Sequence, residues 1–251
     1  DDHHGGVVTQ PVTITITGTN DVPTFTTEPQ TATIAEQPDT TGSSKPDVAQ
    51  GVVGFADVDL SDTHTVSITR VTEQGTTTGL PESEPTILNW LSLGALTDST
   101  GHVTGSQAWT FSAADKNFDY LAAGETLTLT YTIQLDDHHG GIVNTPVTIT
   151  IHGANDAPTL ADVNAGTLTD TAAYDTFSPL TGTLHGHDVD DGETATLTYA
   201  ALNSDHAAVT QITGLYGLLT VNPNGTYSYV PDAAAINALP KGTYADTFTV
   251  E

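Results

Sequence analysis

Residues 1–25 read DDHHGGVVTQPVTITITGTNDVPTF, and residues 136–160 read DDHHGGIVNTPVTITIHGANDAPTL. Eighteen of these 25 positions are identical at an offset of 135 residues. Within each block the segments 12–18 and 147–153 alternate apolar residues with threonine, which predicts a β-strand with one apolar face. An internal repeat of strand-forming sequence therefore organises this chain.

A second, weaker sequence similarity relates a segment between these two blocks to a segment after them. Residues 51–68 read GVVGFADVDLSDTHTVSI, and residues 182–199 read GTLHGHDVDDGETATLTY. We expect residues 1–20 to form the final hairpin strand of a preceding repeat, 21–155 a first β-sandwich, and 156–251 a second one that lacks its final strand. The chain then corresponds to one period of a tandem array. An arbitrary boundary is the alternative interpretation.

The composition excludes several classes of protein. The chain has 31 acidic and 4 basic residues, a formal charge of −27, so phosphate contacts cannot hold it on nucleic acid. It has no cysteine, which excludes thiol catalysis, disulfides and cysteine-based zinc sites. No apolar run is long enough for membrane insertion. With 37% hydrophobic residues the chain is too apolar for disorder, and divalent cations are the natural counter-charge.

Short strands separated by Gly, Pro and Asn turns predict an all-β fold. Alternation continues in 126–135 and 194–202, and residues 218–230 predict a hairpin around Asn224–Gly225. We expect single helical turns at most in 114–121 and 231–240. Seven or eight strands per unit favour tandem β-sandwiches of immunoglobulin-like or cadherin-like type. Four aromatic residues at alternate positions are expected in the cores: Trp109, Phe111, Tyr227 and Tyr229.

The strand order of such a sandwich brings three acidic loops to its N-terminal pole. Carboxylate and amide oxygens suit calcium, which takes 6–8 oxygen ligands at about 2.3–2.6 Å. We therefore expect a calcium site at the junction that precedes the first unit. Its predicted ligands are Asn20, Asp21, Asp57, Asp59 and Asp136 or Asp137, with Asp62 as a further candidate.

The second unit repeats this set of residues. Its predicted ligands are Asn155, Asp156, Asp188 and Asp190, with Asp191 or Glu193, and with Asp1 and Asp2 standing for the hairpin of a following period. The alternative is that these loops are ordinary Asx turns on a solvated surface.

The paired histidines His3–His4 and His138–His139 suggest zinc or nickel, but adjacent residues in a strand point to opposite faces. We favour a tight turn in which Gly140–Gly141 allows positive φ and one histidine covers the acidic site.

The blocks 1–23 and 136–158, together with 109–133 and 217–232, resemble VCBS repeats and, more loosely, cadherin-like and immunoglobulin-like repeats of giant bacterial adhesins. Residues 70–105 fit this pattern least well. The resemblance implies secreted or surface-attached tandem sandwiches with calcium at their junctions, acting as a spacer or fibre in adhesion and biofilm. It does not imply catalysis.

We therefore expect a calcium-rigidified structural repeat of an extracellular bacterial filament, with neighbouring copies as partners and possible strand complementation between them. The first alternative is a glycan- or protein-binding module, with Trp90 as the exposed-aromatic candidate. The second is an accessory domain beside a catalytic part of a longer enzyme.

Overall fold

Alternating apolar residues build two four-stranded sheets between residues 24 and 152. The computed structural model describes residues 1–80 and 82–251. One sheet has the strand order β1-β3-β6-β5, and the other has the order β2-β8-β7-β4. The strands of the first sheet are β1 (Thr24–Phe25), β3 (Pro46–Ala56), β6 (Thr104–Ala114) and β5 (Leu91–Thr97). Those of the second are β2 (Gln30–Ala35), β8 (Ile142–His152), β7 (Thr126–Asp136) and β4 (Thr65–Gly75).

The two sheets face each other across a single apolar core. Inward side chains of both sheets are buried in one cluster, and the rings of Phe111 and Tyr131 meet edge to face at 6.3 Å between the sheets. All pairings are antiparallel except β2 with β8, which is parallel. This arrangement is an immunoglobulin-like sandwich, as the alternation in the sequence predicts.

The second body is a smaller sandwich. One sheet has the order β10-β16-β15-β14, a second has β13-β12-β17, and β9 pairs with β11. The first sheet consists of β10 (Leu180–Thr183), β16 (Thr226–Pro231), β15 (Gly217–Val221) and β14 (Gln211–Thr213). The shorter strands are β9 (Thr159–Leu160), β11 (Gly186–His187), β12 (Ala201–Leu202), β13 (Ala208–Val209) and β17 (Thr249–Val250).

In residues 1–80 and 82–251, helical structure is confined to short segments of three to five residues. They are α1 (Glu84–Leu88), η1 (Asp115–Asn117), η2 (Glu193–Thr196) and α2 (Ala233–Asn237). No helix in the described residues is long and apolar enough to cross a membrane. The hairpin predicted in 218–230 is present as β15 and β16. The long strand predicted over 194–202 is wrong: its partner β17 offers only two residues, so the ladder with β12 has two pairs.

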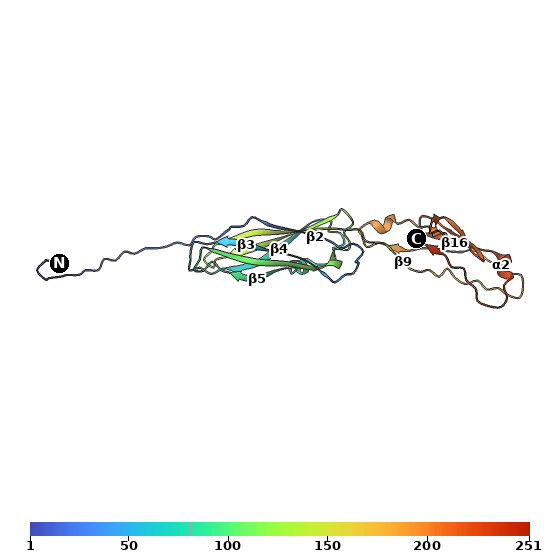
Figure 1. Ribbon diagram of the computed structural model, residues 1–251, viewed down its shortest axis with the longest axis horizontal. Helices are drawn as coiled ribbons and strands as arrows, with labels where there is room; N and C mark the ends of the chain where they lie inside the picture. Colours follow the sequence, from blue (N-terminus) through green and yellow to red (C-terminus); the bar gives the residue numbers. More distant parts are fainter. Residues whose placement is uncertain (81) are drawn as a thin grey trace.

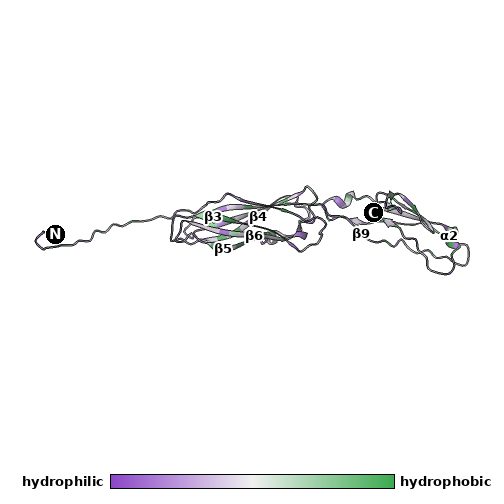
Figure 2. Cartoon of the chain, viewed as in Figure 1, coloured by the Kyte–Doolittle hydropathy of each residue, from purple (hydrophilic) through white to green (hydrophobic). Residues whose placement is uncertain are grey.

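The molecule is elongated, with the two sandwiches placed end to end (Figure 1). Hydrophobic residues follow the strands of both bodies (Figure 2). Residues 1–20 run away from the first sandwich as an extended, exposed segment without strand pairing. The strand expected at 12–18 is therefore unpaired in this chain. The division into 1–20, 21–155 and 156–251 stays a prediction.

Candidate metal centre

Three carboxylates lie at the end of the first sandwich that faces the second. Glu36 directly follows β2, whereas Asp115 and Asp119 lie on the turn that follows β6. One oxygen of each lies within 4.8 Å of the others, and all three side chains are buried. The sequence analysis missed these residues. The signal that it overlooked is two aspartates four positions apart in 115–119, directly after a strand.

Three more acidic residues come from the second sandwich. Asp188, Asp190 and Glu193 each place one oxygen within 4.8 Å of the other two. The Asp190 amide donates to Asp188 Oδ1 over 3.1 Å, an Asx-type turn that fixes the loop locally. Residues 153–158, the linker between the two sandwiches, reach this loop, because the Asp156 amide donates to Asp190 Oδ2 over 3.0 Å.

Hydrogen bonds tie the two acidic groups into one junction. The Ala154 amide donates to Glu36 Oε2 over 2.8 Å, and the Asp191 amide donates to the Tyr120 carbonyl over 2.9 Å. Of the residues predicted for this site, the structure brings together Asp156, Asp188, Asp190 and, of the pair Asp191 or Glu193, Glu193. The side-chain amide of Asn155 instead donates to the Asp156 carbonyl over 2.8 Å.

Several oxygens at this junction are buried without any hydrogen-bond partner among the described residues. Asp156 has 0% exposure, and neither of its carboxylate oxygens is bonded. The other unbonded oxygens are Glu36 Oε1, Asp119 Oδ1 and Asp190 Oδ1. A buried carboxylate without a partner is costly, so this arrangement calls for a positive charge.

The electrostatics point in the same direction. Burial, with added repulsion from Asp156, raises the pKa of Glu36 to about 7 despite the hydrogen bond from Ala154. Burial also raises the pKa of Asp119 and of Asp190, in each case with repulsion from neighbouring carboxylates. The donors are all hard carboxylate oxygens, and this donor set fits calcium.

In the absence of metal, the chain should therefore lose stability as the pH rises. The pKa of Glu36 is about 7 when folded against an ordinary 4.5, so the folded form binds the proton more tightly. The stabilisation is fully present below 4.5 and is lost as the pH passes through about 7. Calorimetry in EDTA should show a lower melting temperature at about pH 8 than at about pH 5. Glu36→Gln should reduce this difference, and an unchanged profile would contradict the prediction.

A second acidic group lies at the N-terminal pole of the first sandwich. Asp57, Asp62 and Asp137 each place one oxygen within 4.8 Å of the others. The Asn20 side-chain amide donates to Asp137 Oδ2 over 3.0 Å, and the Asp21 amide donates to Asp59 Oδ2 over 2.7 Å. Thus three segments converge at this pole, as the strand order predicts. They are the junction at residues 20–21, the loop at 57–62 and the hairpin turn at 136–141. Asp137 rather than Asp136 reaches this pole.

A buried histidine that the sequence analysis missed already occupies part of this second group. His64 Nε2 lies 3.1 Å from Asp57 Oδ2, and its Nδ1 lies 2.7 Å from Asp98 Oδ1. Burial lowers the pKa of His64, but its hydrogen bonds to Asp98 and Asp57 outweigh this effect and raise it. Of the carboxylate oxygens in this group, only Asp62 Oδ2 is buried without a hydrogen bond. The interdomain junction is therefore the stronger candidate.

The DDHHGG segment is a tight turn. The amides of His139 and Gly141 both donate to Asp137 Oδ1 over 2.8 Å, and Gly140 has a φ of 106°. A Cβ on Gly141 would lie 2.0 Å from Asp137 Oδ2, so only glycine fits there. His139 Nδ1 lies 3.3 Å from Asp62 Oδ2, at the edge of the acidic group.

The same turn forms in the exposed N-terminal segment, so its shape is encoded locally. There the amides of His4 and Gly6 donate to Asp2 Oδ1 over 2.8 Å. Asp1 and Asp2 lie at the far end of this segment, away from the second sandwich (Figure 1). Among the described residues they belong to none of the three acidic groups, and their role toward a following copy stays a prediction.

No family model matches this sequence. No curated protein matches it either. Three solved structures that it resembles are the protocadherin GammaB4 extracellular domain (15% identity, TM-score 0.38), human CDH23 EC21-23 (14%, 0.34) and the CooA pilin subunit from enterotoxigenic Escherichia coli (10%, 0.33). The matches cover 84%, 84% and 53% of this chain and 29%, 54% and 99% of those chains. The likeness concerns the β-sandwich fold alone.

Trp90 is not the exposed aromatic that the binding-module hypothesis needs. Its side chain is 8% exposed and meets the rings of Phe111 and Phe118 edge to face at 6.2 and 5.6 Å. It is a core residue because α1 and β5 turn it inward. The expected burial of Trp109, Phe111, Tyr227 and Tyr229 is confirmed.

Proposed function

We propose that this chain is a calcium-stiffened structural repeat of a long extracellular bacterial adhesin or filament, with no catalytic role. The observation that carries the proposal is the set of unbonded carboxylate oxygens on both sides of the junction, with Asp156 fully buried among them. The resemblance to VCBS repeats supplies the cellular setting.

The chain's own residues explain how the junction would respond to a cation. Without one, repulsion between Glu36, Asp156 and Asp190 pushes the sandwiches apart and leaves the linker free to flex. The carboxylates of Glu36, Asp156 and Asp190 would hold calcium, whose two positive charges would offset their mutual repulsion. The two sandwiches would then move as one rigid rod, because the same ion would be bound by both sandwiches and by the linker between them.

The proposed calcium site would suit an extracellular location if it has the affinity typical of extracellular modules. Extracellular calcium modules bind with Kd values of about 10⁻⁴–10⁻³ M, so they are filled outside the cell and not at cytosolic concentrations. Strands of 11 residues, such as β7, span roughly 36 Å at about 3.3 Å per residue. An array of such rods separates its two ends by a distance that grows with each repeat.

Flexibility at the junction provides the direct test. The chain has no cysteine, so Gln74→Cys on the first sandwich and Leu215→Cys on the second allow selective spin labelling. Double electron–electron resonance measures the distance between the two spin labels. The distribution of this distance should be broad in EDTA and narrow in calcium. Adding Asp188→Asn and Asp190→Asn should keep the distribution broad in calcium. Equal widths with and without calcium would refute the stiffening mechanism.

A further inference from the structure

The N-terminal segment exposes the side chains of a core-facing strand. Val12, Ile14 and Ile16 are 87%, 81% and 89% exposed. At the repeat offset of 135 residues they correspond to Val147, Ile149 and Ile151, which are fully buried in β8 of the first sandwich. The same strand sequence therefore occurs twice, once paired and buried and once unpaired in solvent.

The second sandwich has an open edge where such a strand belongs. In the first sandwich β7 is flanked by β4 on one side and by β8 on the other. In the second, β17 pairs with β12 on one side, and among the described residues no strand pairs with its other edge.

A second strand is missing with it. In the first sandwich β2 pairs in parallel with β8. In the second sandwich residues 161–179 form no strand, although Leu168 packs against the core there. The sheet that would contain both strands consists of β13, β12 and β17 among the described residues.

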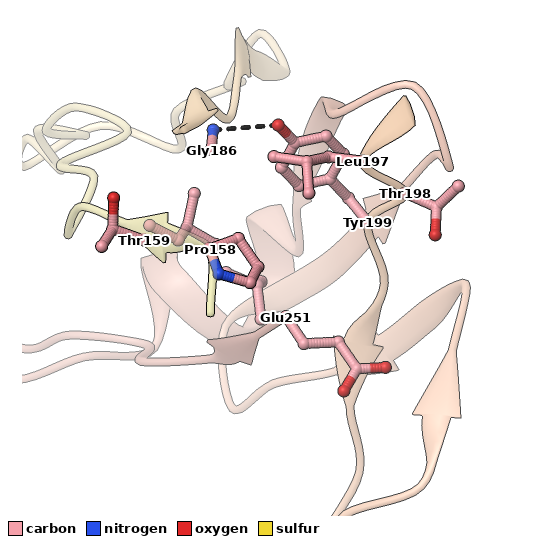
Figure 3. A pocket seen from close by; sticks show the side chains of 9 residues that line it. Pro158, Thr159, Gly186, Leu197, Thr198, Tyr199 and Glu251 are labelled. Carbon is pink, nitrogen blue, oxygen red and sulfur yellow. Dashed lines mark hydrogen bonds between the residues drawn. The ribbon is translucent and has the colours of Figure 1, made fainter. Parts of the chain in front are cut away.

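An apolar groove of about 220 Å³ lies at the end of β17, where this strand meets β9, β11 and the segment before β12 (Figure 3). Leu160, Leu197, Tyr199 and Val250 line it with their side chains. The core beside it is only partly closed, because Phe248 and Val250 remain partly exposed.

We propose that residues 7–18 of a second copy of this chain add as a strand to the free edge of β17. They run antiparallel to β17, as β8 does to β7, and Val12, Ile14 and Ile16 face the core. The added strand also provides an edge on which the segment around Leu168 pairs in parallel. This contact extends the proposed spacer role, because it specifies how one copy follows another.

The charge of residues 7–18 and the asymmetry of the contact both favour this segment as the added strand. Residues 5–19 contain no charged side chain, so the inserted strand adds nothing to the repulsion within a chain of net charge −27. The donor segment extends from the free end of the first sandwich, whereas the acceptor edge belongs to the second sandwich, so the two surfaces are different and far apart (Figure 1). Such a heterologous contact generates an open head-to-tail chain rather than a closed dimer.

Sedimentation velocity on the full chain, in EDTA and in calcium, tests the proposal. The wild type should form head-to-tail oligomers whose mass increases with protein concentration. Ile14→Asp with Ile16→Asp should abolish them, because it places two charges on the core-facing side. Thr13→Asp with Thr15→Asp adds the same charge to the opposite face and should leave assembly largely intact. The substituted segment is unpaired, so neither variant perturbs either sandwich.

A synthetic peptide of residues 7–18 provides a second measurement. Added in excess to the Ile14→Asp/Ile16→Asp variant, it should raise the melting temperature of the second sandwich, whereas a scrambled peptide should not. A wild type that stays monomeric at all concentrations would overturn strand addition, as would equal loss of assembly in both double variants. Because assembly is measured with and without calcium, failure here is distinguishable from failure of calcium stiffening.

Discussion

Asp156→Asn is expected to raise the stability of the calcium-free chain and to remove most of its stabilisation by calcium. Both carboxylate oxygens of Asp156 are buried without a hydrogen bond. They lie close enough to the acceptor oxygens of Glu36 and Asp190 to repel them. An amide at this position has the same shape, no charge and two N–H donors for those acceptors. The substitution therefore relieves repulsion without calcium and removes a ligand with it.

The size of the calcium effect follows from mass action. At about 10 mM calcium and a Kd of about 10⁻⁴–10⁻³ M, one site stabilises the folded wild type by about 1.4–2.7 kcal/mol. Calorimetry in EDTA and in calcium measures both quantities in both proteins. Asp205→Asn makes the same change in an exposed turn and should leave both unaltered. A variant that is less stable in EDTA and still gains the full calcium effect would rule out Asp156 as a ligand.

Trp90→Ala is expected to destabilise the first sandwich by about 3–5 kcal/mol, the usual cost of removing a large buried aromatic side chain. Trp90 fills the space between Phe111 and Phe118, and the alanine would leave a cavity there. Trp90→Phe should cost less because it keeps one ring in the same place.

The composition makes this measurement specific. The chain has two tryptophans, Trp90 and Trp109, both in the first sandwich. In the variant, the fluorescence of Trp109 during urea unfolding therefore reports on the first sandwich without a signal from the second. Val48→Ala, at an exposed position on β3, is the control and should change stability by less than about 0.5 kcal/mol. An equally small effect of Trp90→Ala would show that Trp90 is not part of the core.

Local sequence was sufficient to predict the acidic residues that the linker and the second sandwich contribute to the candidate site. It was insufficient to predict those of the first sandwich. Asp156, Asp188 and Asp190 lie in short motifs that repeat along the chain, so their convergence follows from the strand order. Glu36, Asp115 and Asp119 come from two segments about 80 residues apart in sequence. Among 31 acidic residues, Asp115 and Asp119 are marked only by their spacing of four after a strand. Glu36 has no local signal, and only the packing of β2 beside β8 brings it to the junction.

The sequence by itself determined the alternating strands, the sandwich class, the DDHHGG turn and the convergence of three loops at one pole. These features depend on the two-residue period of a strand and on hydrogen bonds between near neighbours, which a linear pattern records. Only the tertiary structure decided that Trp90 is buried and that His64 pairs with Asp57. It also decided which carboxylates face each other across the junction. Those outcomes depend on contacts between distant segments, where burial and charge act through space and leave no local signature.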